Sequence, residues 1–115
     1  MIVCFFSTCQ ETYPNILVKL IPSINRAYGV TEAEENTQLI FKMHDQYPDI
    51  IKGIDLSGDP SCAKFSDYKE MLKVAKNKGI KLALHCAEVA NEEEILEMLN
   101  FGMDRLGHGT FIDGN

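Results

Sequence analysis

The chain has 115 residues, which is enough for one domain but only about half of a typical eight-stranded α/β barrel. Hydrophobic residues make up 45% and charged residues 24%, a composition typical of a globular protein and not of a disordered one. With 11 Lys and Arg against 17 Asp and Glu, the net charge is −6, which disfavours nucleic acid and anionic membranes as partners and favours a small molecule.

The cysteines and the apolar segments indicate where such a protein would reside. The four cysteines, Cys4, Cys9, Cys62 and Cys86, contain no Cys-x-x-Cys pair and do not form a secreted disulfide framework. The opening MIVCFFSTC is apolar but short and lacks the basic start of a signal peptide, and no apolar run approaches the roughly 18 residues of a membrane span. We therefore expect a soluble cytoplasmic protein with reduced thiols.

Apolar, β-branched runs alternate with amphipathic helical stretches, which is typical of βα units that build a parallel sheet. Residues 15–26 predict a buried strand that leads into a polar loop. Residues 31–46 predict a helix in which Thr31 and Glu34 have capping-box spacing and Leu39, Ile40 and Met43 share one face. The later predicted elements are a strand and loop at 49–60, a helix at 66–79 with Ser66 as N-cap and Gly79 as its stop, a strand at 80–85, a helix at 92–102 capped by Asn91 and ended by Gly102, and a short strand at 104–109.

Four βα-type units in a row fit either a doubly wound sheet or part of an α/β barrel. In both folds the ligand site lies beyond the carboxyl ends of the strands, so the side chains at those ends are the candidates for a site. They are Ser23, Asn25 and Arg26 on the first strand, Asp55, Ser57, Gly58 and Asp59 on the second, His85 and Glu88 on the third, and Arg105 and His108 on the last.

Two of the three histidines stand at predicted strand ends. His85 there is compatible with a metal ligand and also with an imidazole that bonds a carbonyl group. Glu88 favours the first interpretation, since a carboxylate three residues later can reach a metal-bound water or a substrate ring atom, although an exposed loop acid is the alternative. His108 lies between two glycines, which permit a backbone that projects the imidazole into a cavity. His44 is expected to be a surface helix residue.

Three further residues at strand ends have two interpretations each. Gly58 lets the backbone approach a flat ligand closely, but an ordinary Ser-Gly-Asp-Pro turn is equally compatible with the sequence. Arg26 offers a planar fork for a phosphate, with a surface arginine as the alternative. Cys86 beside His85 suggests a Cys-His hydrolase, but adjacent strand residues point to opposite faces. We therefore do not expect Cys86 to be a nucleophile.

Three motifs together resemble the adenosine and AMP deaminase superfamily of metal-dependent barrels. GIDLSGDP, LALHCAEVAN and DRLGHGTF follow one another with helix-length spacers. They are similar to the family motifs Gly-Ile-Asp-Leu-x-Gly, His-x-x-Glu and Arg-(Leu/Ile)-Gly-His-Gly, which follow the fourth, fifth and sixth barrel strands. The resemblance covers about residues 16–112 and is greatest to the branch that acts on N6-methyl-AMP and related N6-substituted purine nucleotides.

The resemblance implies a fold, a cofactor and a reaction. The fold is α/β, part of a (β/α)8 TIM-type barrel with about strands three to six, the cofactor is zinc, and the reaction is hydrolytic deamination of a 6-aminopurine nucleoside or nucleotide. His85 would be a zinc ligand, Glu88 the acid that protonates purine N1, and His108 the group that helps to activate or orient the zinc-bound hydroxide. Gly58 would contact the purine through its backbone, and Asn25, on the predicted ligand rim, is a further candidate for substrate binding.

The sequence also departs from the family pattern. It has neither the His-x-His pair of the first barrel strand nor the Asp-Asp pair of the last. Residues 1–14 match no family motif and are expected to be a divergent start of a partial barrel domain spanning 1–115. The chain is therefore expected to be a segment of a zinc deaminase or, alternatively, a non-catalytic truncated isoform or remnant, with open sheet edges that allow self-association.

Overall fold

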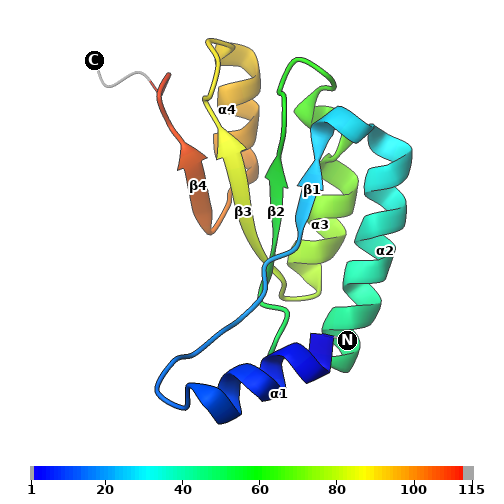
Figure 1. The fold of residues 1–115 in the computed structure, drawn as a ribbon. Coiled ribbons are helices and arrows are strands. Elements are labelled where there is room, and N and C mark those ends of the chain that lie inside the picture. The colour runs from blue at the N-terminus through cyan, green and yellow to red at the C-terminus, as the bar shows by residue number, and fades with distance from the viewer. Residues whose placement is uncertain (1, 113–115) are drawn as a thin grey trace.

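The computed structural model describes residues 2–112 as a four-stranded parallel sheet with helices packed on one face (Figure 1). The elements are α1 (Ile2–Thr12), β1 (Ser23–Asn25), the 3-10 helix η1 (Arg26–Tyr28), α2 (Val30–Gln46), β2 (Gly53–Ser57), the 3-10 helix η2 (Phe65–Asp67), α3 (Lys69–Asn77), β3 (Lys81–Cys86), α4 (Glu92–Phe101) and β4 (Arg105–His108). Helix α1 lies beyond the amino ends of the strands (Figure 1). Within residues 2–112 none of the helices combines the length and the apolar character that a membrane crossing requires.

The strand order decides between the two topologies that the sequence permits. The strands pair in the order β1-β2-β3-β4 and every pair is parallel. In a doubly wound sheet the strand order reverses and helices cover both faces, whereas a barrel wall keeps its strands in sequence and its helices on the outside. The sequential order and the single helical layer (Figure 1) therefore confirm the predicted fold, which is part of an α/β barrel.

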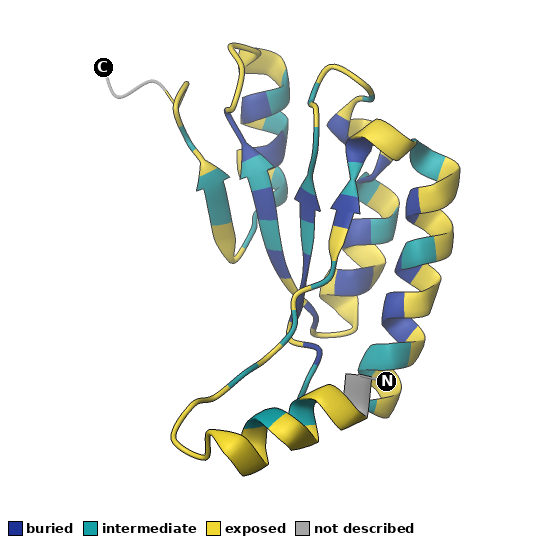
Figure 2. Ribbon diagram, viewed as in Figure 1, coloured by how far each residue is buried: buried dark blue, intermediate teal, exposed yellow. Residues whose placement is uncertain are grey.

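Strand residues alternate between the helix-covered face and the opposite face of the sheet. In β3, Leu82, Leu84 and Cys86 are buried, while Ala83 and His85 are only partly buried (Figure 2). The core thus lies between the sheet and the helices, and the other face carries the polar side chains. The largest fully buried side chains are Tyr68, Phe65, Ile24, Ile51, Ile54, Leu56, Leu72, Ile80, Leu82, Leu84, Met98 and Thr37.

The predicted strand at 15–26 is much shorter in the structure. Strand β1 has three residues, and before it only Leu20 forms an isolated parallel bridge, with Ile51. Ile16 and Leu17 are 59% and 81% exposed. Strand β2 begins only at Gly53, so residues 16–19 have no neighbouring strand to pair with, and their apolar composition alone does not make them a strand.

The predicted helix at 31–46 is confirmed as α2, but its start and its buried face differ. Gly29 is the N-cap, so Thr31 lies inside the helix and does not cap it. Ile40 is buried and Met43 packs against the core, whereas Leu39 is 56% exposed. The periodicity of the sequence therefore identifies the buried face of the helix but wrongly includes Leu39 in it.

The other helix boundaries were predicted with mixed success. Ser66 is not an N-cap, since it lies in η2 and Tyr68 precedes α3. Asn91 caps α4 as predicted, its Oδ1 accepting a hydrogen bond from the Glu94 backbone N–H at 3.2 Å. Gly102 follows α4 with a φ of +84°, a conformation that glycine adopts readily. Helix α1 was not predicted.

The contrast between a core leucine and an exposed one gives a test of the fold. Leu84 is fully buried in β3, and Leu39 is half exposed on α2. Leu84→Ala is expected to lower the free energy of unfolding by about 2–5 kcal/mol, because it leaves a cavity in the core. Leu39→Ala should change it by about 0.5 kcal/mol or less. Urea denaturation of both variants checks this, and similar losses for both would contradict the assigned core.

Candidate functional site

The rim between β1 and β2 brings together two residues that the sequence singled out. Gly58 follows β2 with a φ of +88°, and a Cβ atom there would lie 1.9 Å from Oδ1 of Asn25. That Oδ1 accepts a hydrogen bond from the backbone N–H of Ala27 at 2.9 Å. Any side chain at position 58 would therefore displace Asn25, which explains the glycine by close packing as well as by its backbone conformation.

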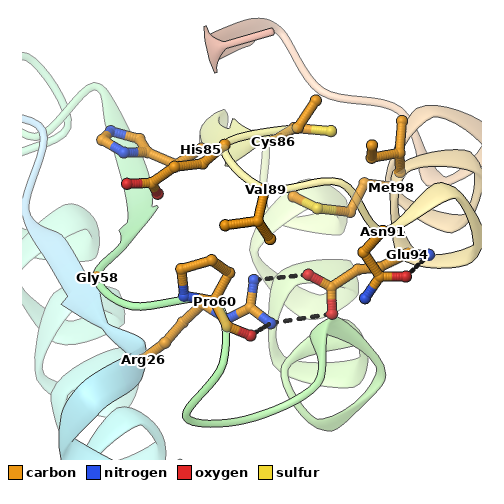
Figure 3. Close-up of a pocket in the computed structure, with 12 residues that line it drawn as sticks. Arg26, Gly58, Pro60, His85, Cys86, Val89, Asn91, Glu94 and Met98 are labelled. Atoms are coloured by element: carbon orange, nitrogen blue, oxygen red, sulfur yellow. Dashed lines mark hydrogen bonds and ion pairs between the residues drawn. The ribbon is translucent and has the colours of Figure 1, made fainter. Parts of the chain in front are cut away.

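Arg26 does not have either of the environments that the sequence suggested. Its side chain is only 3% exposed, and its guanidinium group donates to Glu94, from Nη1 to Oε1 at 2.9 Å and from Nη2 to Oε2 at 3.0 Å (Figure 3). Nη2 also donates to the carbonyl groups of Pro60 and Ala63. Because its guanidinium group is buried and already paired with Glu94 and two carbonyl groups, Arg26 is neither a phosphate ligand nor a surface arginine.

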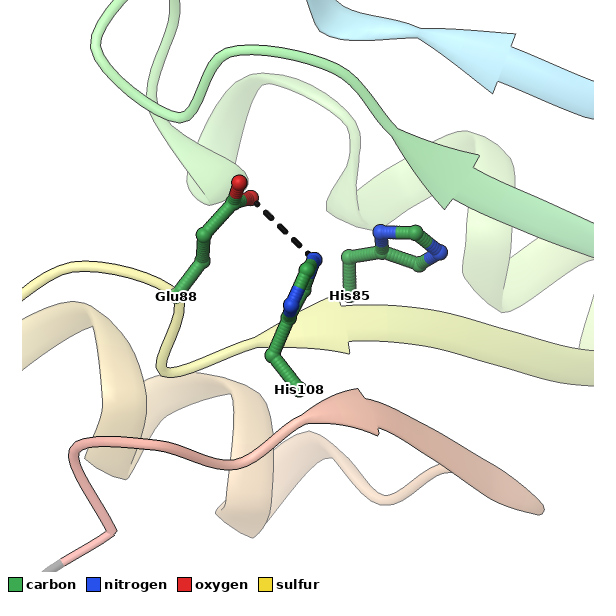
Figure 4. A group of neighbouring side chains, drawn as sticks. All are labelled: His85, Glu88 and His108. Carbon is green, nitrogen blue, oxygen red and sulfur yellow. Dashed lines mark ion pairs between the residues drawn. The ribbon is translucent and has the colours of Figure 1, made fainter.

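His85, Glu88 and His108 come together at the carboxyl ends of β3 and β4 (Figure 4). Their potential ligand atoms all lie within 4.8 Å of one another. The two imidazole rings meet edge to face, with centroids 4.9 Å apart, and Nε2 of His108 lies 3.5 Å from Oε2 of Glu88. Three residues that the sequence placed at strand ends thus form one cluster.

The backbone around these residues has two unusual positions that build the cluster. His108 has a φ of +64°, so it does not follow the alternation of β4 and its ring lies beside that of His85. Ala87 has a φ of +57°, which turns the chain immediately before Glu88. Gly107 pairs with His85 in register, and a Cβ there would lie 2.8 Å from the Cδ2 of His85. The glycine leaves room for the imidazole ring.

Asp55 is a partner of His85 that the sequence placed on the rim without giving it a role. Its Oδ1 lies 3.3 Å from Nε2 of His85, and its Oδ2 accepts a hydrogen bond from the Ser23 hydroxyl at 2.5 Å. The Ser23 hydroxyl is also 2.7 Å from that of Ser57. A carboxylate next to a histidine fixes the orientation of the ring. The parallel register pairs Asp55 with Ser23 of β1 and with Ala83 of β3, and His85 lies two residues after Ala83 on the same face of the sheet.

Cys86 faces away from this cluster. It is 2% exposed and lies on the helix-covered side of the sheet, whereas His85 lies on the other side. Burial raises the pKa of the Cys86 thiol, and the nearby Glu94 carboxylate adds to this effect. A thiol that is buried and protonated is a poor nucleophile. The structure gives Cys86 a packing role.

The residue types in the cluster suit a metal ion. Zinc is commonly bound by imidazole nitrogens and carboxylate oxygens, and His85, His108 and Glu88 offer two of the first and one of the second. They come from adjacent strands and the turn after one of them, so the sheet fixes their mutual distances. The cluster therefore offers donor groups of the kinds that a metal ion takes.

A comparison with known families assigns the chain to a family. The family model of adenosine deaminase matches residues 4–113, so the chain belongs to the adenosine deaminase family. The match begins at residue 4 and therefore includes most of the segment that matched no motif. The resemblance inferred from the three motifs is confirmed.

Individual members of that family are similar to this chain over most of its length. The chain is 50% identical over 112 residues to the adenosine deaminase-like protein of Drosophila melanogaster, covering 97% of this chain and 33% of the relative. It is 39% identical to the N6-methyl-AMP deaminase of Bos taurus, covering 92% of this chain and 30% of that protein. The crystal structure of the Arabidopsis N6-mAMP deaminase superposes with a TM-score of 0.76 at 37% identity, over 86% of this chain and 29% of that one. The chain thus spans about a third of the length of these relatives.

A pair of glycines tests the packing at the rim. Gly58 and Gly79 both have positive φ values, +88° and +80°, but a Cβ at Gly79 would meet nothing within 4 Å. Gly79→Ala is expected to cost about 1 kcal/mol of stability from backbone conformation alone. Gly58→Ala should cost about 1 kcal/mol more, because Asn25 must give up its capping bond to Ala27. Urea denaturation of both variants measures the difference, and equal losses would show that Asn25 gives way without cost.

Proposed function

We propose that the chain forms the central part of a zinc-dependent aminohydrolase that acts on a 6-aminopurine nucleotide of the N6-methyl-AMP type. The observation that carries this proposal is the cluster of His85, Glu88 and His108 at one end of a parallel sheet. Membership of the adenosine deaminase family supports the reaction class. The reaction adds water at C6 of the purine and releases ammonia or methylamine, leaving an inosine-type product.

Each residue of the cluster has a separate task in this proposal. His85 would hold the metal, with Asp55 orienting its ring. Bound zinc lowers the pKa of a water molecule towards neutrality and so supplies a nucleophile at physiological pH. Glu88 would donate a proton to N1 of the purine, which lets the ring accept the electrons of the new bond. His108, beside Glu88, would orient the attacking water, and the backbone at Gly58 would contact the purine.

The substrate class rests on the relatives. Proteins that are 35–39% identical to this chain are named N6-methyl-AMP deaminases, and crystal structures of the related Arabidopsis ADAL contain IMP or GMP. We therefore favour a purine monophosphate over a nucleoside as the substrate. Because Arg26 is bound to Glu94, a phosphate would require a different partner. Asn25 remains our candidate for a substrate contact on this rim.

Replacing Glu88 separates proton transfer from metal binding. In a full-length barrel that contains this chain, Glu88→Gln is expected to reduce turnover of N6-methyl-AMP by about 100-fold or more, since the amide cannot donate the same proton. The zinc content should be unchanged, whereas His85→Ala should lose the metal. Turnover and zinc content measured on the same preparations check this. Loss of zinc in Glu88→Gln would make Glu88 a ligand and overturn the assigned roles.

The 115-residue chain by itself is expected to bind zinc weakly and to release no amine. A catalytic zinc usually has three protein ligands, and the proposed roles give it one from this chain, His85. Competition with a chelating dye would measure the zinc affinity, and release of ammonia or methylamine from adenosine, AMP and N6-methyl-AMP would measure activity. One tightly bound zinc per chain together with steady turnover would show that the chain completes its site, for example across a dimer.

A further inference from the structure

Arg26 lies where the segments that follow β1, β2 and β3 meet (Figure 3). From this geometry we infer that Arg26 is a positioning residue, whose guanidinium group fixes the loop carrying Gly58 against the segment carrying Glu88. The roles of Gly58 and Glu88 are those of the proposed function, so the inference rests on it. The contacts themselves stand on the structure alone.

One guanidinium group makes contacts to three other residues. The guanidinium group of Arg26 donates to both carboxylate oxygens of Glu94 at 2.9 and 3.0 Å. It also donates to the carbonyl groups of Pro60, at 3.2 Å, and of Ala63, both in the loop that follows Gly58. Arg26 is 3% exposed and Glu94 14% exposed. Removing Arg26 would leave the carboxylate of Glu94 without its partner, so the loss of Arg26 is expected to be costly.

Glu94 lies near the start of α4. It is the third residue of that helix, and its backbone N–H donates to the N-cap, Asn91. Glu88 lies in the short segment between the end of β3 and Asn91. Strand β3 holds one end of this segment, and Arg26 holds the other through Glu94. Glu94 also accepts a hydrogen bond from the backbone N–H of Phe65 at 2.9 Å, which ties the end of the β2 loop to the same carboxylate.

Arg26 is itself held in place by other residues. The buried hydroxyl of Tyr68 donates to the backbone carbonyl of Arg26 at 3.3 Å. The preceding residue, Asn25, packs against Gly58. A lysine at position 26 could keep the charge, but it lacks the planar fork that reaches a carboxylate and two carbonyl groups at once. The geometry therefore needs arginine and not only a positive charge.

Hydrogen exchange followed by mass spectrometry on the 115-residue chain tests this inference. In Arg26→Met, peptides covering residues 59–66 and 87–95 are expected to exchange about tenfold faster or more, because the two segments open locally. Peptides covering β2 and β3 should stay within about threefold of the wild-type rate. Arg26→Lys should fall between the wild type and Arg26→Met.

An exposed ion pair in the same region provides the matched control. Lys69, at the start of α3, pairs with Glu97 of α4 at 3.1 Å, with side chains 41% and 33% exposed. Lys69→Met removes a positive charge that faces the same helix, but from a solvated pair. It should change exchange in no peptide by more than about twofold.

Three outcomes would overturn the inference. They are an equal increase in all peptides of Arg26→Met, which would show only a loss of global stability, no increase in the two segments, or segments that are already unprotected in the wild-type chain. The measurement involves neither zinc nor a purine. A failure of the proposed deamination would therefore appear in the turnover and metal assays and leave the exchange pattern unchanged.

Discussion

Parallel pairing in sequence order is the constraint on which the rest of the structure depends. It brings the carboxyl ends of all four strands to one edge of the sheet, so residues far apart in the chain become neighbours there. Gly58, His85 and His108 lie at or just after the carboxyl ends of three different strands. The pairing of the strands is sufficient to bring them to this edge. The strand order therefore determines which residues can share the site.

The same strands serve the core and the site by simple alternation. Outward-facing Leu84 packs against the helices, while its neighbour His85 stands on the opposite face with Asp55 beside it. His108 breaks this alternation, and its positive φ lets two successive strands contribute rings to one cluster. Regular strand geometry would direct the His108 ring to the other face of the sheet, so the positive φ of His108 is what places the ring beside His85.

Much of the fold and the site was predictable because it depends on local sequence. The strand-helix alternation, the cap at Asn91 and the placement of His85, Glu88 and His108 at strand ends all follow from neighbouring residues. The environment of Arg26 was not predictable, since its partner Glu94 lies 68 positions away and only the folded sheet brings them together. Likewise, the exposure of Leu17 depends on whether another strand lies beside it, which a single segment does not encode.

The sequential strand order also has a consequence for how the chain folds. The three pairings join residues 32, 28 and 22 positions apart, so their loop-closure free energies differ by only about 0.3 kcal/mol. The order of assembly must then depend on burial. Strands β2 and β3 carry the fully buried Leu56 and Leu84 at paired positions, and the buried Ile24 of β1 pairs with Leu56, whereas Leu106 of β4 is only partly buried. We expect β1, β2 and β3 to form the folding nucleus, so that substitutions at Leu56 and Leu84 slow folding, and β4 to pair with β3 afterwards.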